Sequence, residues 1–123
     1  MPVFAGYDQQ QRCGKIFFYD ILGAEFEGVE HAISGSGSPT IRGILHYVNR
    51  WSGKPINALD EEEATILVLR LLTSAAEFDS ATGGANVEAN LYPVVKRITE
   101  KGTYTIPAER LKTLFSSEVA HYV

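Results

Sequence analysis

The segment Asp60–Gly84, DEEEATILVLRLLTSAAEFDSATGG, predicts a long helix followed by a glycine pair. Asp60 followed by Glu63 is typical of a capping box, in which each side chain accepts a hydrogen bond from a backbone N–H at the helix start. The glutamates at 61, 62 and 63 lie at the favourable positive end of the helix dipole. Apolar residues then recur at three- and four-residue spacing, namely Ala64, Leu67, Val68, Leu71, Ala75 and Phe78. We therefore expect an amphipathic helix that ends at about Phe78.

The end of this segment, DSATGG (Asp79–Gly84), is open to two interpretations. Aspartate, serine and threonine before two glycines commonly cap the last carbonyls of a helix. A second segment, SGSGSP (Ser34–Pro39), is usually a plain connector, yet its glycines allow the backbone to approach a group bound at a helix start. It lacks the lysine and the spacing of a phosphate loop. Either segment alone is a weak sign of a site.

The residues before Ser38 predict strands. PVFAGY (2–7) is apolar and rich in strand formers, and the segments 15–20 and 24–34 flank the turn-prone DILG (20–23), which favours a hairpin or meander. Ser38 and Pro39 then read as the cap and first turn of a helix that ends near WSGKP (51–55). Its apolar face is expected to comprise Ile41, Ile44, Leu45, Val48 and Trp51.

The residues after Gly84 predict a second hairpin and a last helix. LYPVVKRITE (91–100) and TYTIP (103–107) lie on either side of a turn at Lys101 and Gly102. Pro93 confines its strand to a sheet edge or makes it start later. The last helix is expected to begin at Pro107. Strands, two helices, strands and a helix together predict one α+β domain over residues 1–123.

Composition narrows the class of function. The chain has 123 residues, 45% of them hydrophobic and 21% charged, which suits a globular protein that buries a core. A net charge of −4 with scattered lysines and arginines argues against a nucleic-acid partner. A single cysteine, Cys13, excludes an intrachain disulfide and fits a reducing compartment. No stretch reaches the roughly 20 apolar residues of a membrane span, and no signal peptide is visible, so we expect a cytoplasmic protein.

Metal and cofactor chemistry have no support in the sequence. His31, His46 and His121 lack ligand-like spacing, and the glutamates at 61–63 are better explained by the helix dipole. We therefore expect no metal and no cofactor. A Ser, His, Asp triad stays open, because triads are recognised by geometry, but nothing in the sequence favours one.

The two hydroxyl-rich segments become specific when they are taken together. AGYD (5–8), an aromatic strand ending in FFYD (17–20), SGSGSP opening a helix and FDSATGG (78–84) closing the next follow one another in the order of the proteasome β-type subunits. The chain resembles this family of N-terminal-nucleophile hydrolases, and DSATGG is especially similar to its bacterial members. The terminal YPVVKRITEKGTYTIP (92–107) also resembles the family's last hairpin. The resemblance covers nearly all of this chain and about the C-terminal half of the family's domain. It implies part of a four-layer α/β/β/α sandwich.

The resemblance implies threonine-type endopeptidase activity in a proteasome core particle, with ATP-dependent or ubiquitin-like-tag-dependent protein degradation as its setting. Family members attack a peptide bond with the hydroxyl of a threonine at residue one, whose own α-amine serves as the base. Its ordinary pKa of about 7.7–8.0 lets that amine accept a proton near neutral pH. The family's threonine, aspartate and lysine lie in its N-terminal half, and the earliest threonine here is Thr40. We therefore expect this chain alone to be inactive.

Site residues carry over from the resemblance at matching positions. Ser36 matches the family serine whose hydroxyl forms a hydrogen bond near the nucleophile's amine. Asp79 matches the aspartate that orients that serine and the amine, and Thr82 matches a serine or threonine position in the same network. Asp20 matches an aspartate that faces a neighbouring subunit's specificity pocket. Close approach of the backbone to this centre is expected at four glycines, Gly35, Gly37, Gly83 and Gly84.

The implied partners are other proteasome subunits of the β-ring and α-ring, or a complementing N-terminal half, together with a peptide or protein substrate. One alternative is a non-catalytic structural or assembly module of a proteasome-like ring, in which the same residues serve as scaffold. A remote alternative starts from Pro2, because removal of Met1 would expose a secondary amine like that of the proline-based tautomerases. Beyond Pro2 that resemblance stops.

Overall fold

The N-terminal part of the chain forms a small antiparallel sheet in the computed structural model, which describes residues 3–19, 25–27, 31–79, 82–86 and 91–120. The sheet has the order β1-β2-β3, with both neighbouring pairs antiparallel. The antiparallel pairing of β2 with β3 confirms the predicted hairpin or meander, and its turn at 20–23 lies outside the described residues. The strands are β1 (Val3–Asp8), β2 (Cys13–Tyr19) and β3 (Glu25–Glu27).

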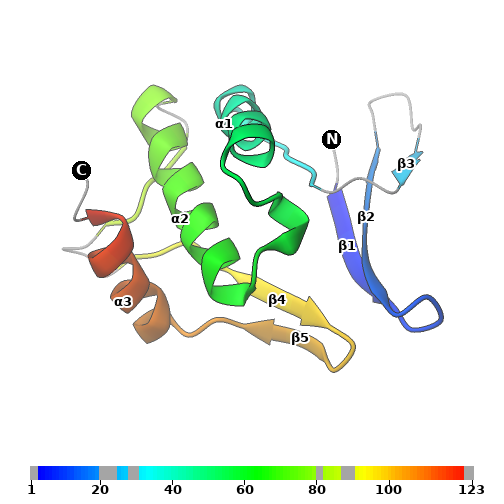
Figure 1. Ribbon diagram of the computed structural model, residues 1–123. Coiled ribbons are helices and arrows are strands. Elements are labelled where there is room, and N and C mark those ends of the chain that lie inside the picture. The colour runs from blue at the N-terminus through cyan, green and yellow to red at the C-terminus, as the bar shows by residue number, and fades with distance from the viewer. Residues whose placement is uncertain (1–2, 20–24, 28–30, 80–81, 87–90, 121–123) are drawn as a thin grey trace.

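Three α-helices, a short 3-10 helix and a second hairpin follow in the described residues, so the α+β class is confirmed. The helix α2 lies between α1 and α3, and the β4-β5 hairpin runs beneath α2 and α3 (Figure 1). The Gln9 side-chain amide, in the β1-β2 turn, donates to the Glu100 carbonyl in the β4-β5 turn at 3.0 Å, which links the two hairpins. The elements are α1 (Ser38–Trp51), η1 (Ile56–Ala58), α2 (Glu61–Phe78), β4 (Lys96–Thr99), β5 (Gly102–Thr105) and α3 (Ala108–Glu118).

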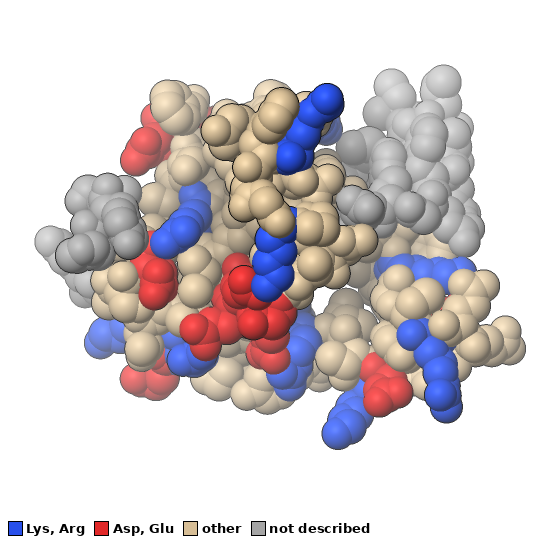
Figure 2. Space-filling view, in the orientation of Figure 1, with Lys and Arg blue, Asp and Glu red and all other residues tan. Residues whose placement is uncertain are grey.

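The start of α2 has the predicted capping box. Asp60 Oδ1 accepts from the Glu63 N–H at 2.8 Å, and Glu63 Oε1 accepts from the Asp60 N–H at 3.1 Å. The three glutamates then form ion pairs with three different parts of the fold. These pairs are Glu61–Arg97 on β4, Glu62–Arg110 on α3 and Glu63–Lys54 in the preceding loop. Figure 2 shows the resulting cluster of acidic and basic side chains over this helix start.

The helix α2 buries two faces rather than the single stripe that the spacing predicted. Leu71 and Ala75 are buried towards α1, whereas Leu69, only 2% exposed, packs on the opposite side with α3. The core around Leu69 comprises Ile106, Leu111, Leu114, Phe115 and Val119. The two predicted stripes were wrong at their last residues, because Trp51 at the end of α1 is 66% exposed and Phe78 at the end of α2 is 77% exposed. Both residues lie at helix ends, where no described element covers them. Val68, within the α2 stripe, is also exposed.

The predicted strand over 24–34 is shorter than expected. β3 ends at Glu27, and residues 31–34 have no regular structure. His31, Ala32 and Ile33 instead line a hollow of about 280 Å³ between α1 and α2. Ala32 and Ile33 thus lie beside the two helices and not in the predicted strand.

The C-terminal elements match the sequence closely. β4 begins at Lys96, three residues after Pro93, so the prediction that this proline delays the strand is confirmed. The turn falls at residues 100–101, one position before the prediction, because Gly102 is already the first residue of β5, and β4 pairs antiparallel with β5. Pro107 is the N-cap of α3, one residue before the helix. Within the described part of the chain, no helix is both long enough and apolar enough to span a membrane.

Candidate functional site

Three of the predicted site residues meet where the start of α1 faces the end of α2. The Ser36 hydroxyl donates to Asp79 Oδ2 at 2.5 Å, and the Thr82 hydroxyl donates to the same oxygen at 2.6 Å. Ser36 and Asp79 are 43 residues apart in sequence, so this contact is made by the packing of α1 against α2. We call Ser36, Asp79 and Thr82 the hydroxyl–carboxylate cluster.

The backbone on each side brings these side chains into place. Asp79 directly follows α2, and its N–H still donates to the Ala75 carbonyl at 2.9 Å, which keeps the carboxylate on the α1 side. The Thr82 N–H donates to the Asp79 carbonyl at 3.1 Å, so Thr82 is bound to Asp79 through backbone and side chain. On the other side, the Ser38 N–H donates to the Gly35 carbonyl at 3.1 Å and closes a tight turn that presents Ser36.

The first helix begins differently from the prediction. Gly37 is the N-cap of α1, and Ser38 and Pro39 are its first two helical residues, so assigning the cap to Ser38 was wrong by one position. No side chain caps this helix start. The reason is that the cap position lies against α2, where a larger residue has no room. A Cβ at Gly37 would lie 2.8 Å from Thr82 Oγ1 and 3.2 Å from the Ala75 Cβ.

The polarity of the hydrogen bonds restricts what the cluster can bind. A hydroxyl has one proton to donate, and Ser36 and Thr82 both donate theirs to the Asp79 carboxylate. Each hydroxyl oxygen therefore keeps only lone pairs for a further polar partner, while the carboxylate carries negative charge. Ser36 is exposed, so a partner can reach it. The cluster is suited to an N–H donor such as an amine or ammonium group.

The other predicted positions have mixed outcomes. Asp20 and Pro2 lie outside the described residues. Gly84 lies close to α2, since a Cβ there would lie 3.3 Å from the Ala76 Cβ, and this contact is not with the hydroxyl–carboxylate cluster. At Gly35 and Gly83 an added Cβ would meet no atom of the described structure within 4 Å. Gly35 has φ +108°, so it is the backbone conformation that favours glycine at this turn.

One contributor to the site was missed by sequence reasoning. Ala75 is fully buried at the contact with Gly37, although the periodicity assigned it only to an apolar stripe. The signal was a small residue on the helix face four positions before Asp79, opposite a glycine. Small residues on both sides let α1 and α2 approach closely enough for Ser36 to reach Asp79.

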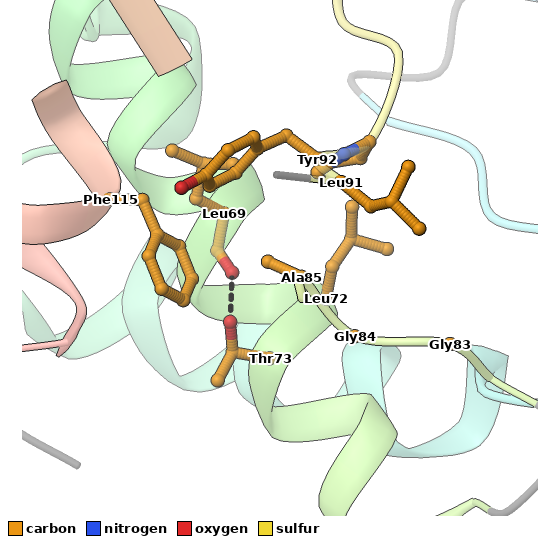
Figure 3. A pocket seen from close by; sticks show the side chains of 10 residues that line it. Leu69, Leu72, Thr73, Gly83, Gly84, Ala85, Leu91, Tyr92 and Phe115 are labelled. Atoms are coloured by element: carbon orange, nitrogen blue, oxygen red, sulfur yellow. Dashed lines mark hydrogen bonds between the residues drawn. The ribbon is translucent and has the colours of Figure 1, made fainter. Parts of the chain in front are cut away.

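A separate apolar cavity of about 230 Å³ lies beyond Gly83 and Gly84. In Figure 3, the rings of Tyr92 and Phe115 lie close to Leu69 on one side of it, and Leu72 and Leu91 lie on the other. Tyr92 and Phe115 pack edge to face, with ring centroids 5.8 Å apart. The cavity lies between α2 and the segments 83–85 and 91–93, with Phe115 as its lining residue from α3. In the described ranges, no group of three or more His, Cys, Asp or Glu side chains is arranged to hold a metal ion.

Comparison with known proteins agrees with the motifs. The chain is 38% identical over 123 residues to a proteasome subunit beta of Streptomyces griseus, which covers 100% of this chain and 40% of the relative. It is 35% identical over 119 residues to a proteasome subunit beta 2 of Thermomonospora curvata, covering 97% of this chain and 40% of the relative. No protein-family model matches the chain.

The chain therefore spans about two fifths of the length of the curated relatives it matches. The likeness runs along all of its residues and defines the class as a bacterial-type proteasome subunit. The chain belongs to the proteasome β-subunit family, of which it represents a C-terminal portion. The resemblance identified from SGSGSP and FDSATGG is thereby confirmed.

Proposed function

We propose that the hydroxyl–carboxylate cluster supports the nucleophile of a threonine-type peptidase centre in a proteasome core particle. The observation that carries the proposal is the convergence of the Ser36 and Thr82 hydroxyls on one oxygen of Asp79, at 2.5 and 2.6 Å. Because both hydroxyls donate their hydrogen bonds to Asp79, their oxygen lone pairs can accept a hydrogen bond from an amine. An α-amine is the general base of a nucleophile located at residue one.

The chemistry follows from the charges. When the amine takes the proton of the attacking hydroxyl, it becomes an ammonium group, and positive charge develops beside the cluster. The Ser36 oxygen accepts an N–H of that group, while the Asp79 carboxylate behind it stabilises the charge. Thr82 holds the carboxylate in place by its second hydrogen bond. The cluster thus orients the base and stabilises its protonated form, and the nucleophile itself comes from outside these 123 residues.

The setting follows from the family. The named relatives are proteasome β subunits. We place this chain with neighbours of a β-ring and an α-ring, or with a complementing N-terminal half, in a cytoplasmic particle that degrades proteins marked for destruction. Its elements then form part of a four-layer α/β/β/α sandwich within a single domain.

The experiment is a chimera in which residues 1–123 replace the matched region of the Streptomyces griseus subunit. The chimera is expected to hydrolyse a fluorogenic peptide, and the 123-residue chain alone is not. Ser36→Ala in the chimera should lower kcat by about tenfold or more, because the base loses its acceptor. Ser116→Ala is the matched control, since Ser116 is an exposed serine on α3.

Two results would contradict the proposal. One is peptide hydrolysis by the 123-residue chain alone that disappears in Ser36→Ala. The other is an active chimera in which Ser36→Ala and Ser116→Ala have the same kcat. An inactive chimera that still assembles into rings would favour the non-catalytic structural module.

A further inference from the structure

The two glycines of the SGSG turn stand in their positions for different reasons. Gly35 has φ +108°, a region that side chains rarely adopt, and the space around it is open. Gly37 has φ −81° and ψ −2°, a conformation available to any residue. Backbone strain therefore explains Gly35 and gives no account of Gly37.

The surroundings of Gly37 supply the reason. Gly37 is buried, and a Cβ built on it would lie 2.8 Å from Thr82 Oγ1, which is closer than real Cβ contacts come. The next atoms are the Ala75 Cβ at 3.2 Å and Asp79 Oδ2 at 3.7 Å. The nearest obstacle is thus the hydroxyl oxygen that donates to Asp79.

Of these neighbours, Thr82 is the one that can yield. Ala75 is fully buried within α2 and has no side-chain torsion that could move its Cβ. Thr82 follows the helix, in a segment without regular structure, and its hydroxyl moves by rotation about χ1. A shift from 2.8 Å to the 3.4 Å of ordinary contact displaces an oxygen that lies only 2.6 Å from its acceptor. A hydrogen bond of that length does not survive a large change of rotamer.

We infer that Gly37 is a positioning residue: the absence of a side chain at this helix cap keeps the Thr82 hydroxyl on Asp79. Gly37 acts through Thr82 and needs no contact with substrate. The catalytic meaning of the inference rests on the proposed function, whereas the geometric part concerns this chain alone.

The test is a double-mutant cycle on the 123-residue chain. Gly37→Ala should lower the melting temperature by about 5 °C or more, because overpacking a buried contact is destabilising. Thr82→Ala removes the obstructing oxygen and leaves the Ala75 Cβ at 3.2 Å as the nearest neighbour, so Gly37→Ala in that background should lower the melting temperature by no more than about 2 °C. Such a non-additive result assigns the clash to the Thr82 hydroxyl.

A spectroscopic measurement separates positioning from general destabilisation. The χ1 angle of Thr82, obtained from three-bond couplings in protein with isotope-labelled threonine, should change in Gly37→Ala. The matched control is Gly43→Ala on the same helix, where an added Cβ meets nothing within 4 Å. In Gly43→Ala the Thr82 rotamer should be that of the wild type, and stability should be equal or higher.

An unchanged Thr82 rotamer in Gly37→Ala would overturn the inference. So would additive losses in the cycle, and so would a double variant that fails to fold while Thr82→Ala folds, because the clash would then be with Ala75. None of these results depends on peptide hydrolysis. Failure of the chimera assay would therefore overturn the proposed function and leave the geometric role of Gly37 to be decided by the cycle.

Discussion

The starts of α1 and α2 treat the unpaired backbone N–H groups of the first helical turn in opposite ways. At α2, Asp60 and Glu63 bind backbone N–H groups of their own helix start, and the glutamates pair with three neighbouring elements. At α1 the cap is Gly37, which has no side chain to offer, and the hydroxyl of Ser36 is directed to Asp79 at the end of α2.

The start of α2 uses its side chains to cap its own helix, whereas the start of α1 directs a hydroxyl to a second helix, as the proposed function requires. A side-chain cap is typically worth about 1 kcal/mol, and serines flank Gly37 on both sides, so a capping residue was close at hand. Pro39 in the first turn reduces the cost, because it has no N–H to satisfy. Before α1, the Ser36 hydroxyl instead binds Asp79 at the end of α2, and capping α1 does not require that contact.

The comparison is tested most severely by Asp79→Asn in the Streptomyces griseus chimera. The substitution keeps the shape and removes the charge that both hydroxyls face. We expect kcat to fall on the order of 100-fold, with unfolding free energy changed by no more than about 1 kcal/mol. Glu77→Gln, an exposed residue two positions away, is the matched loss of charge. Equal losses in both variants would show that net charge, rather than the cluster, is responsible.

The opposite behaviour is expected at the start of α2. Asp60→Ala removes the acceptor for the Glu63 N–H and should lower the unfolding free energy by about 1–2 kcal/mol, with the chimera's kcat unchanged. Urea unfolding followed by circular dichroism measures the loss. Asp60→Ser should recover most of it, because serine also caps helices. A fall in kcat without a loss of stability would remove the distinction between the two helix starts.

The acid side of the stability profile should depend on Glu63. The pKa of Glu63 is lowered, mainly because Lys54 donates to its carboxylate at 2.6 Å and next because the Asp60 N–H donates to it. A group with a lowered pKa in the folded state stabilises above its ordinary value of 4.5 and loses that contribution as pH falls through the folded pKa. The urea midpoint should therefore drop between about pH 5 and pH 3.

Glu63→Gln isolates this contribution, because glutamine preserves the capping box and does not titrate. The variant should show a flatter dependence of the urea midpoint on pH over the same range. Glu77→Gln, at the other end of α2, is the control. A profile for Glu63→Gln that coincides with the wild type would show that the Lys54 pair contributes nothing measurable.

The smallest effect is expected at the Glu62–Arg110 pair. Its side chains are 58% and 49% exposed, and ion pairs in such positions are worth roughly 0–1 kcal/mol. Arg110→Gln should change the unfolding free energy by less than about 0.5 kcal/mol, and added salt should narrow the difference from the wild type. A larger loss that resists salt would mean that the pair also orders α3 against α2.

Local signals were sufficient for the start of α2, for the delay of β4 after Pro93 and for the start of α3. Each depends on residues within a few positions of one another, so spacing in the sequence is close to spacing in the fold. The sequence was a poorer guide at residues 31–34, because Ala32 and Ile33 line the hollow between α1 and α2 and belong to no strand. It also gave no account of the second buried face of α2, because the position of α3 decides that face.

The candidate site, too, was predictable from the sequence in part only. The family resemblance identified Ser36, Asp79 and Thr82 by residue type and order, and the spacing of Asp79 and Thr82 already allowed a local hydrogen bond. The sequence by itself determined which hydroxyls and which carboxylate are available. Only the tertiary structure decided that they share one oxygen, that Gly37 stands where it does for lack of space, and that Ala75 belongs to the contact. The physical reason is that 43 residues separate Ser36 from Asp79, and close packing of two helices at small residues brings them together.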